Sequence, residues 1–110
     1  MTATFTVRIT AGARADLTAI HDYITAARSR PAADELLDLL IEKAEGLRTF
    51  PRRGSIPLES TVIPVGELRQ TIAGPYRVIY RIVDRAVVVV LVADGRRDMQ
   101  ALLAQRLLNG

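Results

Sequence analysis

The chain has 110 residues, 49% of them hydrophobic, and a formal net charge of +3 at pH 7. This length suits one compact domain, residues 1–110, and no apolar run is long enough to span a bilayer. Cysteine is absent and His21 is the only histidine, which excludes disulfides and thiolate chemistry and leaves too few groups for a zinc site or a serine triad. We therefore expect a protein with no metal, no cofactor and no membrane contact.

Residues 1–10 alternate apolar and polar side chains, with Phe5, Val7 and Ile9 on one face. This period of two predicts a half-buried first strand, after which Thr10 is suited to cap a helix. The segment has neither the basic leader nor the apolar core of a signal peptide, so we expect a cytoplasmic protein.

An amphipathic helix is predicted from Ala13 to Ala27, where apolar residues recur every three or four positions. We expect Asp16 in its first turn, where the helix dipole favours an anion. Pro31 stops this helix, because the residue before a proline is pushed out of helical geometry.

A second helix is predicted to open at Pro31 and to end at Phe50-Pro51, which gives a helical hairpin. We expect Asp34 and Glu35 in its first turn and Lys43 toward its end. Its apolar stripe consists of Leu37, Leu40, Ala44 and Leu47.

Residues 52–66 contain two glycines and two prolines and predict a loop, which is long for a compact domain. A brief strand pairing at Val62 and Ile63 is the one regular feature that this pattern allows.

Three strands and a short amphipathic helix complete the chain. The strands are Glu67–Ile72, Tyr76–Asp84 and Ala86–Ala93, and the helix is Met99–Leu108. Short turns join the strands, which predicts an antiparallel meander. The run from Val87 to Val92 is apolar on both faces and predicts a central strand covered on two sides. The result is an α+β domain with the helical hairpin on one face of an antiparallel sheet, which leaves the other face for function.

Positive charge is concentrated in residues 51–110, which contain nine arginines and five acidic residues, a net charge of +4. Guanidinium groups suit bidentate contacts with phosphate or carboxylate, so a polyanion or an acidic peptide is a natural partner. Scattered arginines that only solvate a small domain are the alternative interpretation.

Two arginine pairs stand out. Strand alternation puts Arg77 and Arg81 on one face, either as an anion site or as a solvated strand face. Arg96 and Arg97 follow the central strand at a place where loop side chains project beside a sheet, and the alternative there is a charged turn in which Asp98 caps the last helix.

The remaining candidates are weaker. His21 lies at the edge of the first apolar stripe and is expected to be structural, because no partner for general base chemistry is nearby in sequence. Arg52-Arg53-Gly54 could bind phosphate, but neither a P-loop pattern nor metal-ligand spacing is present.

Five segments, in the same order, resemble toxins of the RelE/ParE superfamily. They are Ala13-x-x-Asp16-Leu17-x-x-Ile20-x-x-Tyr23-Ile24, Leu47-x-x-Phe50-Pro51-x-x-Gly54, Glu67-Leu68-Arg69, Pro75-Tyr76-Arg77-Val78-Ile79-Tyr80-Arg81 and Gly95-Arg96-Arg97-Asp98. The resemblance covers the chain from Val7 to Leu107. It implies the toxin of a bacterial type II toxin–antitoxin system, of the kind linked to plasmid stabilisation and growth arrest.

The superfamily contains ribosome-dependent messenger RNA endoribonucleases, of the RelE type, and ParE toxins that poison DNA gyrase. Arg77 and Arg97 match the phosphate-holding arginines of the ribonucleases. The acid–base groups have no match, because Leu102 and Leu103 stand where a tyrosine is expected and the strand Glu67–Ile72 has no lysine. This deficit favours the ParE branch, for which we expect no catalytic residue.

The resemblance also implies partners. We expect a small ParD-like antitoxin that forms a hetero-oligomer with this chain, and DNA gyrase as the target. Ribosome-bound messenger RNA is the target in the RelE interpretation, and a decayed toxin that only binds antitoxin is a third possibility. The residues expected to bind an anion or the target are Arg69, Arg77, Arg81, Arg96 and Arg97.

Overall fold

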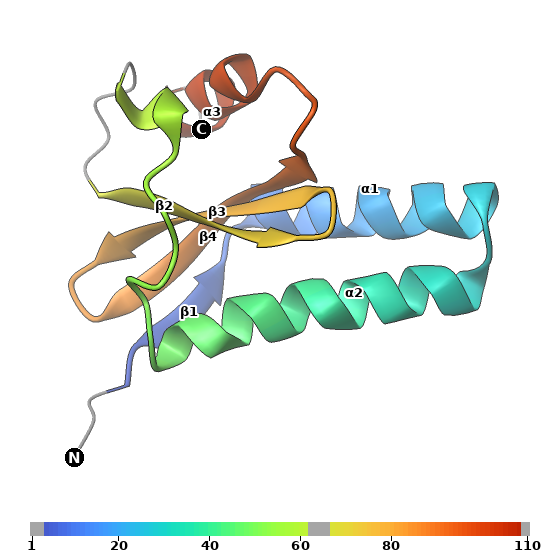
Figure 1. Ribbon diagram of the computed structural model, residues 1–110, viewed down its shortest axis with the longest axis horizontal. Coiled ribbons are helices and arrows are strands. Elements are labelled where there is room, and N and C mark those ends of the chain that lie inside the picture. The colour runs from blue at the N-terminus through green and yellow to red at the C-terminus, as the bar shows by residue number, and fades with distance from the viewer. Residues whose placement is uncertain (1–3, 62–66, 109–110) are drawn as a thin grey trace.

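A computed structural model describes residues 4–61 and 67–108 of the chain (Figure 1). In chain order the elements are β1 (Thr6–Ile9), α1 (Ala11–Ala27), α2 (Arg30–Glu45), the 3-10 helices η1 (Gly46–Arg48) and η2 (Leu58–Thr61), β2 (Leu68–Ala73), β3 (Tyr76–Val83), β4 (Ala86–Asp94) and α3 (Met99–Leu108). The brief pairing expected at Val62 and Ile63 lies outside the described residues.

The four strands form one sheet in the order β1-β4-β3-β2. Strands β2, β3 and β4 are antiparallel neighbours, which confirms the meander and the α+β class. Strand β1 lies parallel to β4, with Val7 opposite Val87, so the sheet is mixed. This pairing makes β4 a central strand, as its two apolar faces predict.

Both long helices begin earlier than their apolar stripes suggest. The Thr10 side chain accepts a hydrogen bond from the amide of Ala13, at 3.1 Å, and starts α1 at Ala11. Ser29 caps α2 in the same way, through the amide of Ala32. The predictions of acidic residues in the first turns were therefore wrong, because Asp16, Asp34 and Glu35 lie beyond the first turns. Asp16 and Asp34 make tertiary contacts instead.

The end of the hairpin also differs in detail from the prediction. The α-helix ends at Glu45, and the chain continues as the short η1 helix before it reaches Phe50-Pro51. Lys43 lies in the last turn of α2, as predicted. The hydroxyl of Tyr80, on β3, donates a 2.6 Å hydrogen bond to the carbonyl of Pro51. This buried bond fixes the exit of the hairpin against the sheet.

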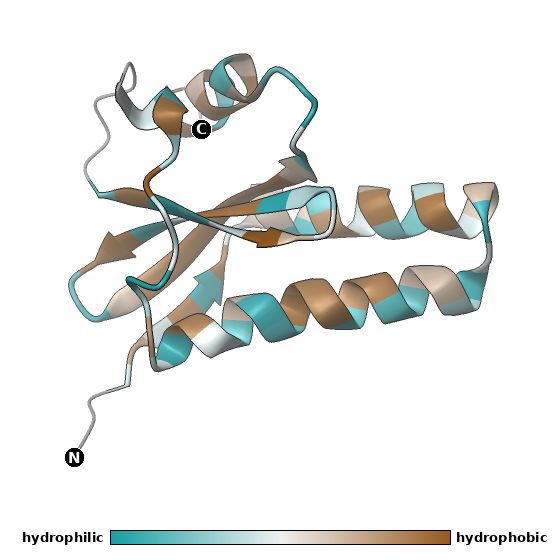
Figure 2. Ribbon diagram, in the orientation of Figure 1, coloured by the Kyte–Doolittle hydropathy of each residue, from teal (hydrophilic) through white to brown (hydrophobic). Residues whose placement is uncertain are grey.

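The hairpin covers one face of the sheet, and Figure 2 shows the middle of α2 and much of β3 and β4 as apolar. The buried residues of this first core are Ala13, Leu40, Ala44, Leu47, Ala73, Tyr76, Val78, Tyr80, Val87, Val89 and Val92. Three of the four predicted α2 stripe residues belong to it. The fourth, Leu37, faces the groove between the two helices.

The second face of the sheet is not left open. Helix α3 packs on it, and the buried residues of this second core are Leu68, Ile79, Val90, Leu91, Ala93, Met99 and Leu103. The expectation of a free face was wrong, because the apolar stripe of the last helix needs the apolar second face of β4 as its partner. No helix within the described part of the chain is long and apolar enough to cross a membrane.

A β-bulge in β4 is held by an ion pair between α1 and α3. Ile79 pairs with Leu91 and Tyr80 with Val89, so Val90 is the extra residue. The Arg106 guanidinium donates to the carbonyl of Val90 at 2.9 Å and to the Asp16 carboxylate at 2.7 and 2.9 Å. The same carboxylate accepts from the amide of Val92 at 3.0 Å. The pair thus satisfies a backbone donor and acceptor beside the bulge.

Candidate anion-binding site

Arg77, on β3, has an acceptor for each of its three side-chain nitrogen atoms. Its Nε donates to the Gln70 side-chain oxygen at 2.6 Å, and its Nη1 and Nη2 donate to the two carboxylate oxygens of Glu59 at 3.2 and 2.7 Å. The Arg77 side chain is 13% exposed. Arg77 is therefore a shielded, neutralised cation rather than a free one.

The turn after β4 packs directly on Arg77. A Cβ atom added at Gly95 would lie 3.0 Å from Cδ of Arg77 and 3.5 Å from the carbonyl of Pro75. The amide of Gly95 donates to that same carbonyl at 2.8 Å. The fold therefore brings Arg77 beside the segment that contains Arg96 and Arg97, two groups that the sequence treats separately.

Arg96 and Arg97 differ in their environments. Arg96 forms a fork on Asp94, with distances of 3.0 and 2.7 Å. The hydrogen bonds from the Arg96 side chain and backbone lower the pKa of Asp94 to about 2. Arg97 is exposed, and no described residue accepts a hydrogen bond from its guanidinium. Among the described residues, the interaction of its guanidinium is the long-range attraction that helps to lower the pKa of Asp94.

The alternative interpretation of the turn also holds, because the Asp98 carboxylate accepts from the amide of Ala101 at 3.1 Å and caps α3. Capping and anion binding do not compete here. Asp98 holds the start of the helix, and Arg97 remains exposed.

The other two candidate arginines lie elsewhere. Arg69 is opposite Tyr80, hence on the hairpin face of the sheet, and donates to Glu67 and to the carbonyls of Arg52 and Gly54. Arg69 thus holds the loop before β2. Arg81 shares a face with Arg77, as alternation predicts, but pairs with Val88 near the opposite end of the strand. The structure therefore gathers three of the five candidates, Arg77, Arg96 and Arg97, at one end of the sheet.

Neither Glu59 nor Gln70 was predicted from the sequence as a site residue. Gln70 had a signal: the short turn between β2 and β3 puts Ile72 opposite Arg77, so Gln70 is its diagonal neighbour on the same face. Glu59 had none, because it lies in a long loop with no periodic pattern. The hydrogen bond from Arg77 lowers the pKa of Glu59, although partial burial opposes this shift.

A cleft of ≈ 630 Å³ lies beside residues 95–97, which we call the arginine turn. It is bounded by α1, the start of β3 and the end of β4. Tyr23 and Tyr76 line it together with Arg96 and Arg97. Tyr23 is 68% exposed, which is unusual for a large aromatic side chain. Burial raises the pKa of the Tyr76 hydroxyl. The cleft thus combines an aromatic wall with two arginines, Arg96 and Arg97, and two carboxylates, Asp16 and Asp94.

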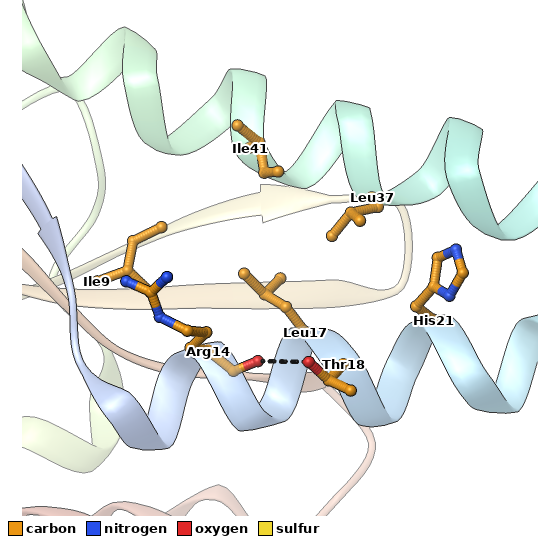
Figure 3. Close-up of a pocket in the computed structure, with 7 residues that line it drawn as sticks. All are labelled: Ile9, Arg14, Leu17, Thr18, His21, Leu37 and Ile41. Atoms are coloured by element: carbon orange, nitrogen blue, oxygen red, sulfur yellow. Dashed lines mark hydrogen bonds between the residues drawn. The ribbon is translucent and has the colours of Figure 1, made fainter.

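A second hollow, of ≈ 340 Å³, lies between α1 and α2 (Figure 3). The side chains of Leu17, Leu37 and Ile41 point into the space between the helices. His21 lines the same groove, and its Nε2 lies 2.7 Å from an Asp34 carboxylate oxygen, which ties α1 to α2. The histidine therefore has the structural contact that the sequence predicts.

The described residues beside Arg77 offer weak acid–base chemistry. Leu103 is fully buried in the second core and Leu102 packs against that core. Glu59, the nearest carboxylate, has both oxygens bound to Arg77 and a lowered pKa. Within residues 4–61 and 67–108, no three His, Asp or Glu side chains form a group that could hold a metal ion.

The topology and the arginine cluster define a RelE/ParE-like toxin fold. The sequence profile of the ParE toxin of type II toxin–antitoxin system, parDE, matches residues 7–99. The chain therefore belongs to the ParE toxin family. No curated protein sequence shows significant similarity to it.

Solved structures show the same fold. The chromosomal ParDE toxin–antitoxin system of P. aeruginosa matches with a TM-score of 0.69 and 17% identity, over 84% of this chain and 97% of the other. The RelBE2 toxin–antitoxin complex of Mycobacterium tuberculosis gives 0.58 and 28%, over 88% and 98%. A mutant of E. coli toxin RelE in the free state gives 0.65 and 12%, over 96% and 97%.

Proposed function

We propose that this ParE-family toxin arrests bacterial growth by poisoning DNA gyrase, and that a small ParD-like antitoxin neutralises it. The observation that carries the proposal is the state of Arg77. In a ribonuclease this arginine would hold the scissile phosphate, but here Glu59 neutralises it, and that carboxylate, with both oxygens bound to Arg77 and a lowered pKa, is a poor acid or base. An anion-binding role without catalysis suits the ParE branch better.

The antitoxin partner is supported by two surfaces of different chemistry. The arginine turn offers Arg97 to carboxylates, and the groove between α1 and α2 offers an apolar floor. A disordered acidic segment that folds on contact would use both, with leucines in the groove and carboxylates on the arginines. The toxin–antitoxin complex RelBE2, whose toxin shares this fold, gives a precedent for a hetero-oligomer.

The deciding experiment compares two targets with the same purified toxin. A gyrase supercoiling and cleavage assay should show inhibition or trapped cleaved DNA, while ribosome-bound messenger RNA should stay intact. Position-specific cuts in ribosomal message, with gyrase unaffected, would replace this proposal by the RelE interpretation.

Arginine variants sharpen the test. Arg97→Ala should weaken gyrase inhibition in a graded way, because it removes charge-assisted contacts worth about 1–3 kcal/mol. Arg77→Ala should weaken it less, because Glu59 already binds the Arg77 guanidinium. Arg8→Ala is the control, since Arg8 is exposed on β1 and makes no side-chain hydrogen bond within the described residues. A loss of several orders of magnitude in RNA cleavage would instead make Arg77 and Arg97 catalytic.

Expression in bacteria tests whether the toxin is active at all. Growth should stop when this chain is expressed alone and resume when the adjacent small open reading frame is co-expressed. Normal growth with abundant soluble toxin would favour a decayed toxin that retains only antitoxin binding.

A further inference from the structure

The contact between Arg77 and Glu59 differs from the other partly buried arginine contacts of the described chain. Arg106 and Arg69 each donate to backbone carbonyls as well as to a carboxylate. Within residues 4–61 and 67–108, Arg77 donates to side chains alone, those of Gln70 and Glu59. Withdrawal of the Glu59 carboxylate would therefore cost Arg77 no backbone acceptor, and among the described residues the backbone group that the carboxylate leaves is the amide of Glu59 itself.

The Glu59 side chain is also placed to leave. It lies on η2, a single 3-10 turn, and is 22% exposed, so water can reach the carboxylate. Gln70 holds Nε of Arg77 at 2.6 Å independently of Glu59. The guanidinium would therefore keep its orientation, with Nη1 and Nη2 free to receive another carboxylate in the same fork geometry.

The surroundings favour an acidic chain as the replacement. Gly95 packs on the aliphatic part of Arg77, and the next two residues are Arg96 and the exposed Arg97. An acidic segment that passes this turn would meet Arg97 at the surface and could insert one side chain toward Arg77. We propose that Arg77 is the receptor for an exchangeable carboxylate, which Glu59 fills in the free toxin and an Asp or Glu side chain of an acidic partner segment fills in the complex.

This inference rests on the proposed function, in which the antitoxin supplies that acidic segment. Shape favours a carboxylate over a nucleic acid. Arg77 is 13% exposed beneath η2 and against Gly95. A glutamate side chain projects from its backbone and can reach such a site, whereas a backbone phosphate has a sugar on each side and needs an open surface.

In the test, a hexaglutamate peptide is titrated into the purified full chain. Binding is monitored by NMR through the arginine Nε–H signals. The peptide should shift the Arg77 and Arg97 signals with one affinity, and the Glu59 carboxyl carbon signal should move as that group is released. Glu59→Gln should tighten peptide binding about tenfold, because the internal competitor for a charge-assisted fork is gone.

Glu67→Gln is the matched control. Glu67 is also a loop carboxylate bound to arginines, Arg52 and Arg69, so this variant removes the same charge without freeing Arg77. It should change the peptide affinity by less than about twofold, as expected for an exposed pair. Adding Arg77→Lys to Glu59→Gln should abolish the gain, because lysine cannot form the fork.

Several results would overturn the proposal. Equal gains in Glu59→Gln and Glu67→Gln would reduce the effect to net charge, and a Glu59 signal that stays still in the unaltered chain during saturation would mean that no exchange occurs. Tighter binding of a single-stranded oligonucleotide of matched charge would assign the site to nucleic acid. These readouts involve neither gyrase nor growth, so the proposed target can fail while carboxylate exchange still holds.

Discussion

Arginine has at least three roles in this molecule, and the neighbouring acceptors decide which role each side chain has. Arg106 donates to the carbonyl of the bulge residue Val90, and Arg69 donates to a carbonyl of the loop before β2. Arg77 forms a bidentate contact with a carboxylate. All three are partly buried, yet in the part of the chain that the structure describes Arg77 differs from the other two in having no backbone acceptor. Sequence separates none of these roles, because the acceptors come from distant parts of the chain.

At the residue scale, Gly54→Ala should destabilise the protein. The added Cβ would clash with the Gln70 carbonyl oxygen and the Tyr80 hydroxyl, one a strand backbone atom and the other a buried hydrogen-bonded group. Neither can yield easily, so we expect a cost of about 1–3 kcal/mol in the free energy of unfolding, measured with urea. Gly46→Ala is the control: its nearest atom is Nη1 of Arg53 at 3.4 Å and its backbone is helical. A destabilisation by Gly54→Ala no larger than that by Gly46→Ala would contradict this account.

Acid should weaken the Glu59 contact in a defined direction. The hydrogen bond from Arg77 holds the pKa of Glu59 below its usual value of 4.5. A lowered folded-state pKa contributes stability that is present above 4.5 and lost as the pH falls through the folded pKa. Between these two values Glu59→Gln should show a shallower loss of stability with falling pH than the unaltered chain. Identical acid limbs in thermal melts would show that this pair contributes no pH-dependent stability.

At the element scale, the parts of the fold that sequence predicted are those coded by local periodicity. The alternation in β3 correctly predicted that Arg77 and Tyr80 lie on opposite faces of the sheet. The apolar run in β4 correctly predicted a central strand. What sequence missed depends on tertiary contacts. The position of α3 required knowing which face of β4 still lacked a partner. The helix starts are local features: Thr10 was predicted to cap the first helix and does so, whereas Ser29, the cap of the second, was not predicted.

In the candidate site too, local sequence identified the residues but not their tertiary contacts. Chain position was enough to select Arg77, Arg96 and Arg97, but it gave no reason to expect them at one end of the sheet. Their proximity follows from the β3–β4 register, in which Tyr76 pairs with Asp94. Glu59 enters from a loop whose path no local pattern encodes.

The Arg106–Asp16 ion pair between α3 and α1 gives a prediction at the element scale. Arg106→Met should cost about 2–3 kcal/mol in the free energy of unfolding, because it leaves the partly buried Asp16 carboxylate and the Val90 carbonyl without their donor. Hydrogen exchange at the Val92 amide should accelerate in the same variant. Arg8→Met, at an exposed position, is the control and should change stability by less than about 0.5 kcal/mol. Equal effects of the two substitutions would show that the Arg106–Asp16 ion pair does not contribute to the free energy of unfolding.

At the scale of the whole molecule, the sheet lies between the helical hairpin and α3 (Figure 1), and the basic turn and the apolar groove belong to different layers. The turn after β4 carries Arg96 and Arg97, while the groove is formed by α1 and α2. A partner that covers both must be extended, which suits a chain that is disordered until it binds.

This division predicts how antitoxin binding should respond to salt. Contacts to the exposed Arg97 are screened, since the Debye length falls from about 10 Å at 0.1 M to about 3 Å at 1 M. Apolar contacts in the groove lined by Leu17, Leu37 and Ile41 are not screened in this way. Titration calorimetry with the cognate antitoxin should therefore show an affinity that falls with ionic strength and then levels off.

Two variants separate these contributions. Arg97→Ala should reduce the salt-dependent part of the affinity, whereas Leu37→Ala should lower the affinity at the plateau and leave the slope against ionic strength unchanged. An affinity independent of salt would remove the arginines from the interface, and one that falls without a plateau would remove the groove.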